Sequence, residues 1–166
     1  MPELSPLERL QPSLLDRLTD DEPSQQTESR ERRIISINQL KKLVQRDVSW
    51  LLNTRNLETV ENLSRYPEVQ SSVLNYGILD LAGIPTSSFD ELRIERALVK
   101  SFRQFESRLL PNSIKLKAKI NRDEMNANAI TFELMADMWA QPMPLQLYIE
   151  TDVDLENGMF NFARVN

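Results

Sequence analysis

The sequence predicts an α+β fold in which helices come first and a sheet of antiparallel or mixed strands follows. Up to Pro111, apolar residues recur at the three- and four-residue spacing of one helical face. After Pro111 they recur at every second position, which is typical of half-buried strands. Because helices and strands are segregated along the chain, α+β is favoured over an alternating α/β architecture.

Residues 1–33 are expected to form a docking peptide and a flexible linker ahead of one folded domain, residues 34–166. Pro12 can open a short helix. This helix carries the apolar residues Leu14, Leu15 and Leu18. Because so short a helix is not stable alone, its leucines must dock on this protein or on another. Residues 20–33 are polar and charged, as in a flexible linker.

Ser36 can cap the first long amphipathic helix, which is expected to end around Asn53. A shorter helix can start at Pro67 and reach Leu74, and Gly77 beyond it is free to adopt a positive φ.

The second long amphipathic helix is expected to start after Ser88, which can cap it in a capping box with Glu91, and to end near Phe105. Glu106 and Arg108 follow directly. Residues two apart do not face each other on a helix, so these charges are not expected to form an ordinary surface ion pair. Either both are solvated at a fraying helix end or each is held for a partner elsewhere.

Four strands are predicted, at residues 114–121, 130–139, 145–151 and 159–163, with the Asn157-Gly158 turn signal before the last.

Three lysines, Lys115, Lys117 and Lys119, line one face of the first strand. They suit an anion-binding strip, but lysines also protect sheets from unwanted edge pairing, and Glu133 and Asp137 can pair with them across strands. The structural interpretation is favoured.

Composition narrows the function classes. The net charge of −5 argues against a general nucleic-acid binder. The chain has no cysteine and no histidine, which removes thiolate chemistry, the commonest general base and the commonest metal ligand. We therefore expect no metal and no cofactor. Neither a signal peptide nor an apolar run of membrane-spanning length is present, so a cytoplasmic location without membrane insertion is expected.

Two further site hypotheses are disfavoured. A carboxylate-based hydrolase would need Glu106 near Asp80, Asp90 or Glu95, and the sequence cannot place them together. The acidic turn at 152–158 faintly suggests a calcium loop, but its spacing fails and a solvated hairpin is favoured. Five aromatic residues are possible interface anchors, although singly each is more often in a core. They are Trp50, Tyr66, Tyr76, Phe105 and Trp139.

Four blocks of the sequence, taken together in their order and spacing, indicate a protein family. They read PSLLDRLTDD (12–21), RDVSWLLNTR (46–55), YPEV with SVLNYG (66–77), and Ile94-Glu95 leading to FESRL (105–109). The pattern resembles the TssE family of type VI secretion baseplate subunits, which is related to contractile-phage baseplate wedge proteins and was historically labelled lysozyme-like.

The resemblance implies site residues. The family signature is Glu-Pro-Arg, and Glu106 and Arg108 match its charged ends, while Ser107 replaces the proline. The two charges are then expected to bind the core of the wedge. The short N-terminal helix, through Leu14, Leu15 and Leu18, is expected to dock on a neighbouring subunit.

The resemblance also implies a non-enzymatic baseplate wedge domain at 34–166 with a sheath-subunit-like sheet, present once per wedge and six times per baseplate. Its expected partners are the wedge subunits TssF, TssG and TssK. An open strand edge at 114–121 or 145–151 is expected to template the sheath subunits TssB and TssC by strand addition. The alternatives are a carboxylate-based peptidoglycan hydrolase and a wedge subunit of a phage-derived contractile particle.

Overall fold

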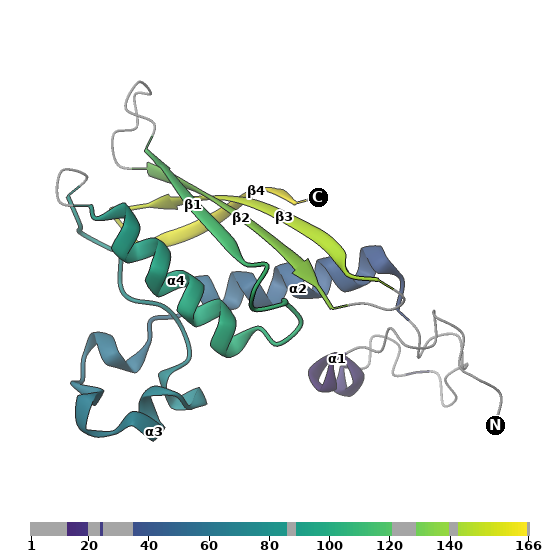
Figure 1. The fold of residues 1–166 in the computed structure, drawn as a ribbon, viewed down its shortest axis with the longest axis horizontal. Helices are drawn as coiled ribbons and strands as arrows, with labels where there is room; N and C mark the ends of the chain where they lie inside the picture. Colours follow the sequence, from purple (N-terminus) through teal and green to yellow (C-terminus); the bar gives the residue numbers. More distant parts are fainter. Residues whose placement is uncertain are drawn as a thin grey trace.

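The computed structural model describes residues 13–19, 24, 35–85, 89–120, 129–139 and 143–165. Helices precede a four-stranded sheet, so the predicted α+β class is confirmed (Figure 1). In this part of the chain, none of the helices has the length and apolar character that a membrane crossing requires.

The helices are α1 (Leu14–Leu18), α2 (Ile37–Leu52), α3 (Pro67–Gln70) and α4 (Glu91–Phe105). Single turns of 3-10 helix lie at Leu57–Thr59, Leu63–Arg65 and Val73–Asn75. The predicted helix from Pro67 to Leu74 is therefore split into α3 and a 3-10 turn. The Ser36 hydroxyl accepts the N–H of Gln39 at 3.1 Å, which confirms the predicted cap of α2.

The predicted capping box of α4 is wrong. The helix begins at Glu91, and Asp90 is its cap, accepting the N–H of Arg93 at 3.1 Å. A carboxylate suits this place because it also meets the positive end of the helix dipole. Ser88 and Pro12 lie outside the described residues. The cap observed at α1 is Ser13.

The strands are β1 (Lys115–Ile120), β2 (Ala129–Met138), β3 (Leu145–Asp154) and β4 (Met159–Val165). They pair in sequence order, and every pair is antiparallel. The edges of the sheet are therefore β1 and β4. The expectation that residues 145–151 offer an open edge is wrong, because consecutive hairpins enclose β3 between β2 and β4. The predicted edge at 114–121 corresponds to β1.

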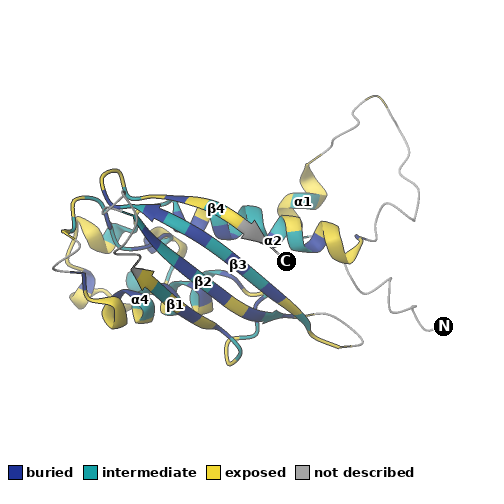
Figure 2. Cartoon of the chain, turned by 90° about the horizontal axis from the view of Figure 1, so that it is seen from above, coloured by how far each residue is buried: buried dark blue, intermediate teal, exposed yellow. Residues whose placement is uncertain are grey.

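The core lies between one face of the sheet and the two long helices, with α4 beside β1 and α2 beside β4 (Figure 1). Alternate residues of β2 are buried, as the period-two spacing predicts, and Figure 2 shows the same alternation along β3. The largest side chains of this core include Phe102, Leu98, Phe132 and Ile149. The acidic turn closes the β3–β4 hairpin, where Asn157 Oδ1 accepts the N–H of Met159 at 2.8 Å.

Gly77 lies where two segments of the backbone approach each other closely. Its φ is 121°, and the neighbouring residue Ile78 forms a parallel bridge with Arg55. A Cβ on Gly77 would lie 2.4 Å from the carbonyl oxygen of Thr54. We expect Gly77→Ala to lower the free energy of unfolding by about 1–3 kcal/mol from backbone strain, with the clash in addition.

Urea denaturation measures this loss, and Gly83→Ala is the matched control. Gly83 also has a positive φ, of 74°, but an added Cβ would meet no atom within 4 Å. The control should therefore lose less stability than Gly77→Ala. Equal losses would show that the close approach to Thr54 contributes nothing.

Candidate functional site

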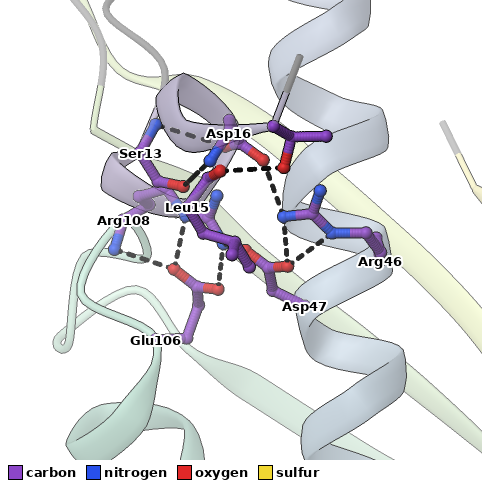
Figure 3. A network of polar contacts seen from close by, with 8 residues as sticks. Ser13, Leu15, Asp16, Arg46, Asp47, Glu106 and Arg108 are labelled. Carbon is purple, nitrogen blue, oxygen red and sulfur yellow. Dashed lines mark hydrogen bonds and ion pairs between the residues drawn. The ribbon is translucent and has the colours of Figure 1, made fainter. Parts of the chain in front are cut away.

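An ion network joins the N-terminal helix α1, the middle of α2 and the end of α4 (Figure 3). In order, its members are Asp16, Arg46, Asp47, Arg108 and Glu106. Positive and negative side chains alternate along it, so each charge lies beside an opposite one. The network therefore connects three segments that are far apart in the sequence.

Glu106 and Arg108 pair with each other. The Arg108 Nε atom donates to Glu106 Oε1 at 2.7 Å, and Nη2 donates to Oε2 at 2.6 Å, a bidentate arrangement. As expected, they do not form an ordinary surface ion pair, but they are neither solvated nor held only for separate partners, because the rule against pairs two residues apart holds only within a helix. The helix ends at Phe105, and Glu106 has the non-helical angles φ −112° and ψ 85°.

The pair is largely buried. The Glu106 side chain is 6% exposed and that of Arg108 is 20% exposed. A carboxylate at the C-terminal end of α4 also faces the negative end of the helix dipole, so Arg108 is needed to compensate it. Burial lowers the pKa of Arg108, but the hydrogen bonds and charge of Glu106, and then those of Asp47, outweigh burial and raise that pKa above its ordinary value.

Asp47 lies between two guanidinium groups. Its Oδ2 atom is 2.5 Å from Arg108 Nη2, and its Oδ1 atom accepts a hydrogen bond from Arg46 Nε at 2.8 Å. The Arg46 guanidinium also lies 4.7 Å from the centre of the Trp50 ring, one helical turn further along α2. Sequence reasoning missed Asp47 and Arg46 as site residues, although both lie in the second block of the resemblance.

The short helix α1 turns its polar side to the domain. Asp16 Oδ1 lies 2.8 Å from Arg46 Nη2, and the Asp16 side chain is only 6% exposed. The three predicted docking residues are exposed: Leu14 by 73%, Leu15 by 48% and Leu18 by 74%. No residue of α1 is buried (Figure 2). The helix is thus attached by charge, and its leucines lie free at the surface.

Asp16→Ala is expected to release α1 without destabilising the domain, because Arg46 is 31% exposed and keeps its contact with Asp47, and because α1 contributes no apolar residue to the core. An ion pair with an exposed partner contributes only about 0.2–1 kcal/mol. Hydrogen exchange of the amides of residues 15–19 should accelerate, while the melting temperature should stay within about 2 °C. Arg17→Ala, at an exposed position of the same helix, is the control and should change neither. Unchanged exchange in Asp16→Ala would contradict attachment through this carboxylate.

Acidification should have the same effect as that substitution. Burial raises the pKa of Asp16, but the hydrogen bonds with Ser13 and the contact with Arg46 outweigh burial and hold the pKa below its ordinary value of 3.8. The contribution of this group to attachment is therefore complete above pH 3.8 and is lost as the pH falls through the lower folded-state pKa.

The carboxylates considered for hydrolysis are not gathered around Glu106. Asp80 Oδ1 accepts the N–H of Ala82 at 3.0 Å, Asp90 caps α4, and Glu95 Oε1 accepts the N–H of Ala118 at 2.8 Å. Each therefore has a structural partner elsewhere. The described residues also contain no group of three or more side chains suited to holding a metal ion.

The aromatic residues divide into two groups. Trp50, Tyr66 and Trp139 are at least half exposed, as an interface anchor must be. Tyr76 and Phe105 instead pack edge to face, with ring centroids 5.2 Å apart. Burial, followed by the nearby charges of the ion network, raises the pKa of Tyr76.

The chain is thus a small α+β subunit, and its ion network links three segments of the chain to one another. The family model of baseplate wedge protein gp25 matches residues 38–143, which is more than half of the 166 residues. The chain belongs to this family and is a structural component of a phage-like contractile baseplate. No curated protein and no solved structure matches the chain. The match includes Arg46, Asp47, Glu106 and Arg108, whereas α1 lies outside it.

Proposed function

We propose that the chain is the TssE-type subunit of a type VI secretion baseplate, that it binds the core of the wedge and that it seeds the sheath. The observation that carries this proposal is the largely buried Glu106–Arg108 pair at the position of the signature within the family match. The block at 12–21, outside the match, adds to the resemblance. The subunit is cytoplasmic, with one copy per wedge and six per baseplate.

Core binding is assigned to the end of α4 and the middle of α2. Asp47 and Arg108 are each about one-fifth exposed, so part of each charged side chain is accessible to a partner. A polar group from TssF or TssG would form a charge-assisted hydrogen bond with that accessible part. The leucines of α1 add an apolar contact to a neighbouring subunit of the same TssF–TssG–TssK wedge.

Sheath seeding is assigned to an edge of the sheet, where strand addition would recruit the first TssB and TssC subunits. The test compares purified baseplates with and without this chain after sheath subunits are added, with sheaths counted by electron microscopy. Sheaths should grow only on baseplates that contain the chain. Equal sheath numbers on both would overturn the seeding function.

A wedge subunit of a phage-derived contractile particle is the second candidate, because the matching family is named for a baseplate wedge protein. Binding to TssF and TssG, compared with binding to phage wedge proteins, separates the two. The peptidoglycan hydrolase alternative has a direct assay as well. We expect the purified chain to leave the turbidity of a cell-wall suspension unchanged, and clearing would contradict a purely structural role.

A further inference from the structure

The chain contains two tryptophans, Trp50 and Trp139, and both contact members of the ion network. Both side chains are about half exposed, although tryptophan has one of the largest apolar side chains. A single exposed apolar residue needs no explanation, because much of any protein surface is apolar. Here, however, every indole of the chain lies beside the same five charged residues, and the packing of the core does not require this arrangement.

Trp50 shares one face of α2 with the network. It lies three residues after Asp47 and four after Arg46, the spacings at which side chains on a helix are neighbours. The Arg46 guanidinium lies 4.7 Å from the centre of the Trp50 ring. Asp16 and Asp47 in turn hold this guanidinium by ion pairs. A half-exposed ring that is fixed in this way loses little conformational freedom when a partner covers it.

Trp139 lies beside Arg108, just beyond the end of β2. Leu109 and Met138 form an antiparallel bridge, which places Trp139 directly opposite Arg108. The Trp139 N–H donates to the Arg108 carbonyl at 2.7 Å, so the pairing continues by one residue beyond the bridge. Residues that lie opposite each other in an antiparallel pairing are close neighbours. The second indole is therefore attached to the backbone next to the arginine of the buried ion pair.

We infer that Trp50 and Trp139 are the apolar anchors of the wedge contact, next to the charged rim formed by Asp47 and Arg108. This inference rests on the proposed binding of the wedge core. Charged groups at an interface contribute mainly specificity, whereas buried tryptophans and arginines contribute most of the affinity. The surface of TssF and TssG that binds here should then present apolar side chains around a central polar or charged group.

Truncation of each indole tests its energetic role. Trp50→Ala and Trp139→Ala should each weaken binding to TssF and TssG about 30-fold or more, the loss typical of an interface anchor. Tyr66→Ala is the matched control, because Tyr66 is a similarly exposed aromatic residue at the start of α3 and outside the network. The control should bind as wild type does, and circular dichroism checks that each variant is folded. Wild-type affinity of either folded tryptophan variant would overturn the inference.

Accessibility of the indoles tests the place without any truncation. The chain is produced with 5-hydroxytryptophan, so that its two indoles can be excited apart from the tryptophans of TssF and TssG. Acrylamide, a neutral quencher, should reach both indoles in the free chain and neither in the wedge. Trp50→Phe and Trp139→Phe each leave one indole and so assign the signals. If the wedge forms and either indole stays open to acrylamide, core binding stands and this inference is wrong. If no wedge forms, the proposed core binding fails and the inference fails with it.

Discussion

Arg108→Ala is expected to lower the free energy of unfolding by about 3–5 kcal/mol, the usual cost of removing one partner of a buried ion pair. The Glu106 carboxylate, only 6% exposed, would be left uncompensated at the negative end of α4. Asp47 would lose its contact with Arg108 as well, although it keeps Arg46. Urea denaturation followed by circular dichroism measures the loss.

Two variants control for this prediction. Arg103→Ala removes an exposed arginine of α4 whose one hydrogen bond within the described residues is to the carbonyl of Pro111, so it should cost less than about 1 kcal/mol. The double variant Glu106→Gln with Arg108→Met removes both charges and should recover most of the loss, because uncharged replacements of a buried pair are often neutral. An Arg108→Ala protein as stable as wild type would refute the structural role of the pair.

The same neutral double variant should fold but fail to hold the wedge core. If Glu106 and Arg108 also bind TssF and TssG, removing both charges should weaken the complex by about 2–5 kcal/mol, roughly 30-fold or more in affinity. The reason is that the charge-assisted hydrogen bonds to the core are lost while the domain stays intact. A pull-down with TssF and TssG at graded concentrations measures the change. Wild-type affinity would show that the network serves only the fold of this chain.

These two measurements separate the role of the pair in stability from its role in partner binding. The resemblance alone assigns both charges to partner binding. The bidentate contact shows that Glu106 and Arg108 already satisfy most of each other's hydrogen bonds within the chain. A single alanine substitution therefore reports stability and binding together. The neutral double variant reports binding alone, which makes it the sharper probe of the interface.

Local patterns in the sequence were sufficient for the two long helices and the strands, but not for the short turns between the helices. Spacing predicts α2 from Ser36 and the alternation along β2, because amphipathic periodicity depends only on which face is buried. Boundaries were less secure: Asp90 rather than Ser88 caps α4, since several polar residues before a helix compete for that position. Pairing was harder still, and the open edge expected at 145–151 proved to be internal strand β3.

The candidate site was only partly accessible from the sequence. The signature points to Glu106 and Arg108, but Asp47 reaches Arg108 across 61 positions, and such a contact has no local periodicity. The role of Asp16 could not be predicted either, because the apolar pattern of this segment points only to the leucines beside it. One signal in the sequence could have pointed to Arg46 and Asp47. They are adjacent opposite charges in the middle of α2, a helix that buries one apolar face.

The most direct measurement is co-expression of this chain with TssF, TssG and TssK, purification through a tag on this chain, and native mass spectrometry of the product. The account predicts a stable wedge that contains one copy of this chain. Recovery of the chain alone, monodisperse and without wedge subunits, would contradict it.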